Sequence, residues 1–194
     1  MTIHAAVLDR HFYARDTLIV ARDLLGKKLV RQIDHQKLSG IIVETEAYCG
    51  RADSACHAHR GMTKRNAVMF GEPGHAYVYF TYGMHHLLNL VTESTGTPCA
   101  VLIRAIMPVS GLEAMEARRL KRGKNLTNGP GKVCQALGID LAQNGLDVTT
   151  GNSLWVEETL EPTTRAIETT PRIGIDYANP EDLNALWRFL LRPL

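Results

Sequence analysis

The stretch Gly40–Gly50, which reads G-I-I-V-E-T-E-A-Y-C-G, places two carboxylates in a segment with the character of a buried strand. Positions 41–43 are β-branched and glycines bound the run, a pattern that predicts a β-strand. Because strand side chains alternate, Glu44, Glu46 and Tyr48 should share one face. Carboxylates are rarely buried without a partner or a chemical task. The stretch is therefore either a half-exposed strand with solvated glutamates or the centre of a site.

Length and charge set the broad class of the protein. With 194 residues, 45% of them hydrophobic and 22% charged, we expect one globular domain spanning residues 1–194. A net charge of +2 does not by itself indicate a nucleic-acid partner. The distribution says more, because Arg118–Lys132 holds six Lys/Arg and no acid, whereas Glu157–Asp182 holds seven Asp/Glu and two Arg. This asymmetry favours one surface that binds a polyanion.

The cysteine spacing bears on metal binding, and the hydropathy bears on the cellular location of the protein. Positions 49, 56, 99 and 134 are the four cysteines and form no C-x-x-C pair, so we expect reduced thiols. The spacing of Cys49, Cys56, His57 and His59 matches no common zinc signature, and we therefore expect no metal. No apolar run reaches membrane-spanning length, and residues 1–16 lack the apolar region of a signal peptide. A cytoplasmic protein without a membrane partner is the expectation.

Capping and turn residues predict the order of the elements. The sequence predicts a helix capped by Asp16 and ended by Gly26, followed by a hairpin of Lys28–Ile33 with the Gly40 strand. It predicts core strands at 87–91 and 100–106 and outer strands at Ser153–Glu157 and Arg172–Ile175. Two further helices are expected: one opened by a Ser110–Glu113 capping box and closed by Gly123, and one with Pro130 in its first turn and Gly138 beyond its end. The segment Trp187–Leu191 fits either a helix or a buried strand.

Aromatic and polar residues stand out on the predicted core strands. Three of the six tyrosines fall within Tyr77–Tyr82, and alternation puts Tyr77 and Tyr79 on one face. The run is either an aromatic core strand or a stacking surface for a planar ligand. Asn89 and Arg104 are polar exceptions inside apolar runs, so each is either satisfied structurally or placed for a ligand.

The loop K-N-L-T-N-G-P-G-K leads into the helix that begins at Pro130. Helix N-termini present free N–H groups to anions, and Lys124 and Lys132 flank this one. The pattern favours a contact to a phosphate backbone, with a solvated loop as the alternative.

Five motifs occur in a characteristic order: I-V-E-T-E-A-Y (42–48), A-C-H (55–57), Y-V-Y-F-T-Y-G-M (77–84) with Asn89, L-I-R-A (102–105) and N-G-P-G-K-V-C-Q-A-L (128–137). Together these motifs resemble those of the alkyladenine (3-methyladenine) DNA glycosylase family. The resemblance covers roughly residues 10–190 and is specific as a set. It implies an α+β fold: a single compact domain whose antiparallel β-sheet forms a partly open, barrel-like core with peripheral helices.

The resemblance also implies a function and its residues. The expected protein is a monofunctional DNA repair glycosylase that flips alkylated or deaminated purines out of duplex DNA, works without a cofactor and acts as a monomer. Glu46 corresponds to the general base that activates water, and Arg104 to the group that helps to place that water. The remaining roles are the base pocket (Tyr48, His57, Tyr79, Asn89), the wedge that enters the duplex (Tyr82, Met84) and the DNA backbone contacts (Lys124, Lys132).

Two other classes of protein remain open at this stage. A carbohydrate glycosidase could use Glu44 and Glu46 as a carboxylate pair, since residues i and i+2 on a strand lie about 6.5–7 Å apart. A non-catalytic nucleic-acid-binding module would explain the basic run but would leave Glu46 and Arg104 without a task. Catalysis on damaged DNA accounts for more of the sequence than either alternative.

Overall fold

The structure is a computed structural model that describes residues 5–159 and 165–192, except for the side chain of Lys124. The strands are β1 (Lys28–Ile33), β2 (Gln36–Tyr48), β3 (Ala76–Thr81), β4 (His85–Thr92), β5 (Cys99–Ser110), β6 (Leu154–Glu157), β7 (Ile167–Thr170) and β8 (Arg188–Leu191). The α-helices are α1 (Arg10–Tyr13), α2 (Thr17–Asp23), α3 (Leu112–Arg119), α4 (Pro130–Leu137) and α5 (Pro180–Asn184).

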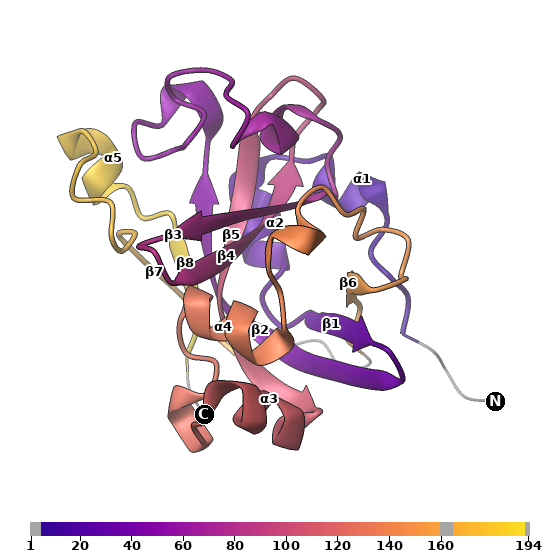
Figure 1. The fold of residues 1–194 in the computed structure, drawn as a ribbon. Coiled ribbons are helices and arrows are strands. Elements are labelled where there is room, and N and C mark those ends of the chain that lie inside the picture. The colour runs from indigo at the N-terminus through magenta and orange to yellow at the C-terminus, as the bar shows by residue number, and fades with distance from the viewer. Residues whose placement is uncertain (1–4, 160–164, 193–194) are drawn as a thin grey trace.

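One antiparallel sheet organises the fold, with the strand order β3-β4-β5-β2-β1-β6 (Figure 1). The 13-residue β2 is its central strand. Its first half pairs with β1, its second half pairs with β8, and β5 runs along its other edge. Register shifts against β5 on either side of Glu44 mark an irregularity in β2. Such bulges increase strand twist and are common beside active sites.

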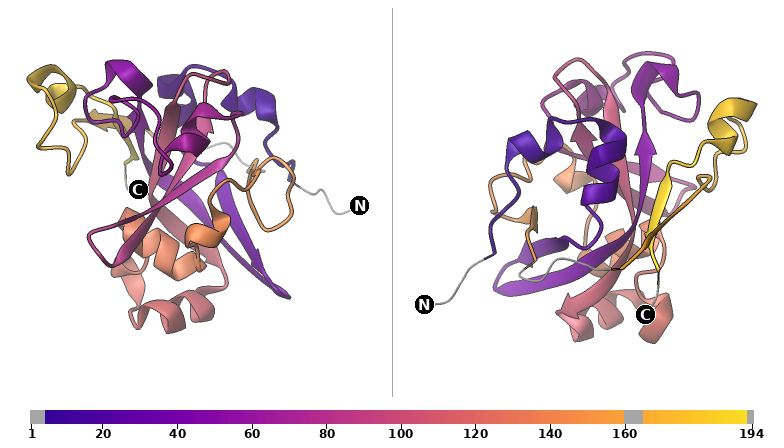
Figure 2. Two further views of the ribbon diagram at one scale, coloured as in Figure 1. Left: turned by 45° about the horizontal axis from the view of Figure 1, so that its top comes forward. Right: turned by 180° about the vertical axis from the view of Figure 1, so that it is seen from behind.

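Helices cover both sides of this curled sheet. Helices α3 and α4 lie in front of it in Figure 1, and α1 and α2 come to the front when the molecule is seen from behind in Figure 2. Helix α2 packs on β2 and β5, whereas α4 packs on β4 and β5. One large core cluster joins residues from these helices with the inner side chains of the strands. The fold is thus a single compact α+β domain, as expected.

Most of the predicted elements are confirmed because their signals are local. Asp16 caps α2, because its side-chain Oδ1 accepts hydrogen bonds from the N–H groups of Leu18 and Ile19, each with an N···O distance of 3.0 Å. Strand β1 has the predicted bounds, and α4 begins at Pro130 and ends before Gly138, which has a φ of 60°. The segment after Trp187 is a strand, because β8 pairs with the free edge of β2.

Two predictions were wrong. The capping box at Ser110 does not form, because Ser110 ends β5 and its hydroxyl shares a hydrogen bond of 2.8 Å with that of Ser39. Gly111 is therefore the N-cap of α3, and the helix ends at Arg119, before a left-handed Leu120. Arg172–Ile175 is not a strand; the strand is β7, which ends at Thr170.

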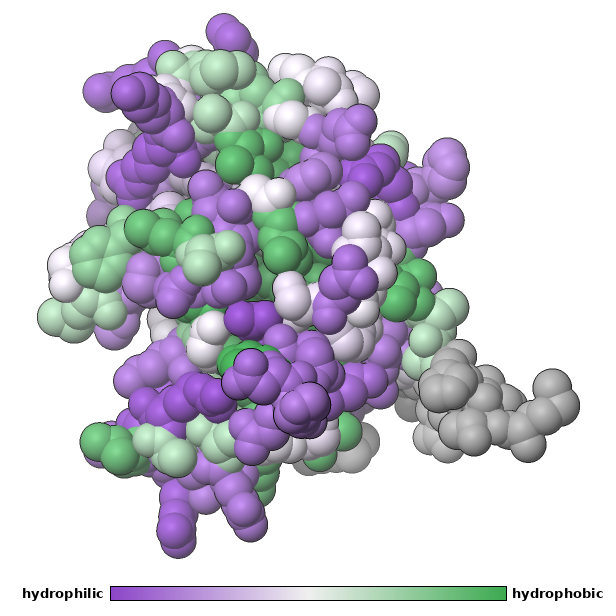
Figure 3. All heavy atoms as spheres, turned by 45° about the vertical axis from the view of Figure 1, so that its right-hand side comes forward, coloured by the Kyte–Doolittle hydropathy of each residue, from purple (hydrophilic) through white to green (hydrophobic). Residues whose placement is uncertain are grey.

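The surface is mainly hydrophilic on the face shown in Figure 3. Hydrophilic side chains cover most of its lower part, the end of the molecule where α3 and α4 lie. No helix among the described residues has the length and apolar character needed to cross a membrane.

Candidate active site

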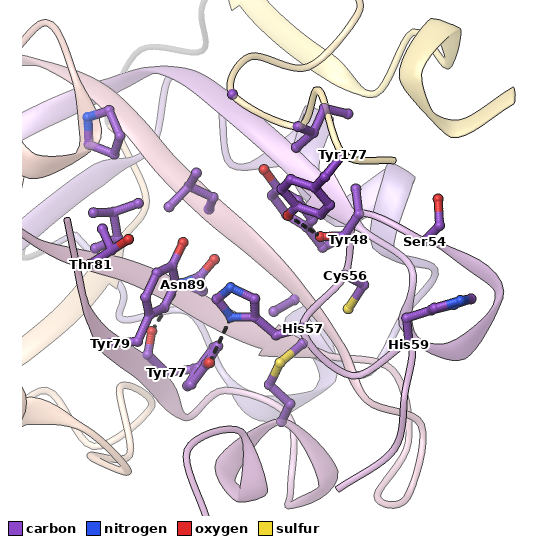
Figure 4. A pocket seen from close by; sticks show the side chains of 18 of the residues that line it. Tyr48, Ser54, Cys56, His57, His59, Tyr77, Tyr79, Thr81, Asn89 and Tyr177 are labelled. Carbon is purple, nitrogen blue, oxygen red and sulfur yellow. Dashed lines mark hydrogen bonds between the residues drawn. The ribbon is translucent and has the colours of Figure 1, made fainter. Parts of the chain in front are cut away.

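A cavity of about 700 Å³ opens beside the second half of β2. Its walls come from β3, β4, β5, the loop after β2 and the chain between β7 and β8 (Figure 4). We call residues 171–187 the C-terminal strap. Ile173, Ile175 and Tyr177 of this strap line the cavity opposite residues of the sheet.

Aromatic side chains dominate the cavity. His57 lies between Tyr48 and Tyr79 in Figure 4, and its ring centroid is 4.5 Å from that of Tyr79. The His57 Nδ1 and the Tyr77 hydroxyl are 2.9 Å apart, joined by a dashed line in Figure 4. Burial, aided by the charge of Arg65, lowers the pKa of His57 to about 4, so this imidazole is neutral at physiological pH. Burial also raises the pKa of Tyr48 and of Tyr79, so these two rings and His57 carry no charge.

Glu46 is completely buried directly behind this cavity. Its Oε2 accepts hydrogen bonds from the Tyr48 hydroxyl (2.9 Å) and Arg104 Nη1 (3.2 Å), and its Oε1 accepts one from the Ile173 N–H (2.8 Å). Burial raises the pKa of Glu46, while these three donors oppose that shift. The carboxylate does not itself line the cavity, whereas all three of its donors do.

Arg104 is held against Glu46 by a second carboxylate. Its Nε donates to Glu44 Oε1 over 2.8 Å, and the same oxygen accepts from Arg188 Nε over 2.7 Å. Glu44 thus lies between two guanidinium groups, both largely buried. The two glutamates share a face of β2 but have different surroundings: Glu44 fixes arginines, and Glu46 has one acceptor position left on Oε1.

Asn89 occupies the floor of the cavity. It is 4% exposed, and its Nδ2 donates to the Tyr77 carbonyl over 3.1 Å. Because this bond fixes the amide, the side chain presents a rigid polar group among apolar strand residues.

The turn between β3 and β4 exposes two large side chains at the rim. Tyr82 is 78% exposed, lines the cavity mouth and has a φ of 52°, followed by Gly83 at 67°. The Met84 N–H donates to the Thr81 carbonyl over 3.2 Å, so this is a tight hairpin turn with both central residues left-handed. Left-handed backbone is costly for a bulky residue, and such strain clusters at functional sites. Met84, 70% exposed, adjoins it.

The remaining predicted residues lie apart from the cavity or make other bonds. Lys132 is in the first turn of α4 and donates to Asn128 Oδ1 over 2.7 Å; the side chain of Lys124 lies outside the described structure. Two of the loop groups considered for metal make other contacts: His59 Nδ1 contacts the Arg51 carbonyl at 2.8 Å, and Cys56 Sγ contacts that of Pro98. No metal-binding cluster forms among the described residues.

The sequence did not predict the C-terminal strap or the ion pair that holds it in place. Arg172 forms a fully buried, bidentate ion pair with Asp53. The only available signal was an arginine isolated among acidic residues, which does not identify a partner 119 positions away.

Comparisons with known proteins identify the class. Residues 11–193 match the methylpurine-DNA glycosylase family, and the chain belongs to that family. It is thus a DNA glycosylase, a hydrolase of N-glycosyl bonds, and the expected resemblance is confirmed.

Curated relatives agree over nearly the whole chain. A protein of Methanocella arvoryzae is 55% identical over 94% of this chain and 91% of its own length. One from Carboxydothermus hydrogenoformans is 53% identical over 88% and 89%, and one from Alkaliphilus oremlandii is 46% identical over 95% of both. All three are provisionally named 3-methyladenine DNA glycosylases.

Proposed function

We propose that this protein flips alkylated or deaminated purines out of duplex DNA and hydrolyses the N-glycosidic bond with a water activated by Glu46. The products are the free base and an abasic site. The observation that carries the proposal is a buried glutamate, held by three donors, directly behind an aromatic cavity. The relatives named as 3-methyladenine DNA glycosylases support the same class of substrate.

The aromatic walls suit an alkylated purine. A base leaving the duplex loses its stacking and recovers it between Tyr48, His57 and Tyr79. Purines alkylated at N3 or N7 are cationic, and a neutral aromatic cradle attracts a cation by about 0.5–2 kcal/mol. A charged His57 would oppose this attraction, so its low pKa favours the cationic base. This attraction favours cationic alkylated purines over uncharged normal ones.

The proposed reaction needs one general base and one water molecule. The free lone pair of Glu46 Oε1 accepts a water proton while the water oxygen attacks C1′ of the sugar. The C1′–N bond breaks, its electron pair leaves with the purine, and the ionised carboxylate stabilises the oxocarbenium-like charge on the sugar. Arg104 keeps the carboxylate oriented and helps to place the water. Glu46 is completely buried, so the attacking water must reach Oε1 beside Ile173, whose N–H bonds the same oxygen and which lines the cavity.

The rim of the cavity carries side chains that we expect to contact DNA. Tyr82 and Met84 project from a rigid turn at the cavity mouth, where an inserted side chain can fill the space that a flipped nucleotide vacates. Lys132, and Lys124 as the sequence predicts, would contact phosphates near the N-terminus of α4.

A carbohydrate glycosidase with Glu44 as its general acid fits the site poorly. Glu44 Oε1 accepts from Arg104 and Arg188, so this carboxylate is held in two ion pairs and does not line the cavity. The described residues that line the cavity include no lysine. An imine intermediate would require a lysine amine, so the site favours direct hydrolysis by water.

The test is to incubate the protein with duplex oligonucleotides that each carry one lesion: 3-methyladenine, 7-methylguanine, hypoxanthine or ethenoadenine. The expected result is free base and an intact strand with an abasic site, in the presence of a chelator. Strand cleavage without added base or heat, or loss of activity in the chelator, would contradict the proposed reaction.

A further inference from the structure

The guanidinium of Arg172 lies behind the cavity wall and has no part in the chemistry proposed above. Its Nη1 and Nη2 donate to the two carboxylate oxygens of Asp53 over 2.6 and 2.8 Å, and both side chains are 0% exposed. Nη1 also donates to the Ala47 carbonyl over 3.0 Å. The pair therefore ties the C-terminal strap to the end of β2.

Asp53 is itself fixed by the loop that follows β2. Its Oδ2 accepts from the Cys49 N–H and its Oδ1 from the Ala55 N–H, each over 3.0 Å. Four donors thus converge on this carboxylate, two from the backbone and two from Arg172. Such charge-assisted, bidentate bonds allow little movement of either group.

Arg172 contacts two of the three groups that bond Glu46. Its guanidinium lies 4.9 Å from the ring centroid of Tyr48, whose hydroxyl donates to Glu46 Oε2. The next residue along the chain, Ile173, donates its N–H to Glu46 Oε1. On another side, the ring centroid of Trp187 is 4.8 Å from the same guanidinium. Movement of Arg172 would therefore displace donors on both oxygens of the proposed base.

We infer that the buried Asp53–Arg172 pair positions the carboxylate of Glu46 for proton abstraction by holding Tyr48 and the Ile173 N–H in place. The inference rests on the proposed function, because it assigns Arg172 a role through Glu46. Arg172 is a positioning residue, since it touches neither the cavity nor the reacting atoms. The third donor, Arg104, is set separately by Glu44.

Stability alone does not account for this pair. A buried ion pair loses the hydration of both charges, and well-packed hydrophobic residues often stabilise a fold equally well. A bidentate pair does, however, fix the direction of the chain beside it. Errors of about 1 Å in the placement of a catalytic group can lower a rate about 100-fold.

Three variants test the inference. Arg172→Lys keeps the charge but loses the planar, bidentate and stacking geometry. Asp53→Asn removes the charge of the partner. Ile173→Pro removes the N–H that reaches Glu46, but it also replaces the Ile173 side chain and restricts the backbone of Arg172. Glu157→Gln is the control, because Glu157 forms a partly buried ion pair with Lys28 that joins β6 to β1, and neither residue lines the cavity.

The measurements are the single-turnover rate of base release as a function of pH, lesion-DNA binding and the thermal midpoint. Single turnover at saturating protein isolates the chemical step from binding. The charged or titratable groups near Glu46 are Arg104, Glu44, Tyr48, Tyr79 and Arg172. Because the Ile173 N–H favours the ionised form, its displacement should shift the acid limb of the rate profile to higher pH.

We expect the three variants to lower the rate about 10- to 100-fold with the acid limb shifted upward, while binding by Arg172→Lys and Asp53→Asn stays within about twofold of wild type. The control should lower only the thermal midpoint. A wild-type rate and acid limb in Arg172→Lys, or in Asp53→Asn and Ile173→Pro if Arg172→Lys does not fold, would overturn the inference. Glu46→Gln, run in parallel, separates the two proposals: if it retains the wild-type rate, the assignment of the base is wrong and the positioning role is wrong with it.

Discussion

The Tyr48 hydroxyl donates to the carboxylate of Glu46 over 2.9 Å, although the two residues are only two positions apart on β2. Strand alternation places both on one face, so a cavity wall and the proposed base are supplied by the same short segment. Burial raises the pKa of both groups, which keeps the phenol protonated and able to donate. In the proposed reaction, a purine that binds against Tyr48 would contact the same side chain that orients Glu46.

Glu46→Gln should retain the shape of the site and remove the proposed general base. We expect the release of hypoxanthine from a duplex oligonucleotide to fall ~10²-fold or more, because a proton acceptor is lost from the transition state. Binding of lesion DNA should persist, and a gel-shift measurement checks this. Near-normal release of the cationic, easily lost 7-methylguanine would show that proton abstraction contributes less than proposed.

The pH profile should have its acid limb above the ordinary range of a glutamate. Only the ionised carboxylate accepts a proton, so the rate falls as the pH drops through the pKa of Glu46, and burial raises that pKa. His57 does not interfere, since it stays neutral down to about pH 4. Single-turnover rates across a pH series check the prediction. An acid limb at or below the unperturbed value of about 4.3 would contradict it.

Tyr82→Ala should weaken binding to lesion duplex and slow base release about 10-fold or more, because unstacking a base step costs a few kcal/mol that the inserted ring would offset. Lys132→Ala is the comparison. It should weaken binding to all duplexes alike and reduce the slope of affinity against salt by about one charge. A uniform, salt-linked loss in Tyr82→Ala would identify it as a backbone contact instead.

Asn89→Ala should increase the excision of normal or mismatched guanine while hypoxanthine is released as before. Guanine carries an exocyclic amino group at C2, which the rigid amide of Asn89 would exclude by its bulk and by ~1–3 kcal/mol of unsatisfied hydrogen bonding. Competition between guanine- and hypoxanthine-containing duplexes measures the ratio. Unchanged guanine release with a lowered thermal midpoint would mean that Asn89 supports only the strand pairing.

Much of the fold was predictable from local signals in the sequence. The Asp16 cap, the bounds of β1, and the Pro130 start and Gly138 end of α4 each depend on residues within a few positions of one another. The shared face of Glu44, Glu46 and Tyr48 follows from alternation alone. The aromatic character of β3 was equally visible, because the tyrosines are consecutive on one face.

What the sequence could not determine depends on partners far along the chain. Glu44 and Glu46 are equivalent by pattern, and they differ because Arg188 of β8 reaches one while the strap residue Ile173 reaches the other. Arg172 lies in a run that resembles a strand, yet its guanidinium forms a buried ion pair with Asp53, 119 positions away. Local propensity decides the backbone of each element, whereas the burial of charge is decided by which distant groups the folded chain brings within hydrogen-bonding distance.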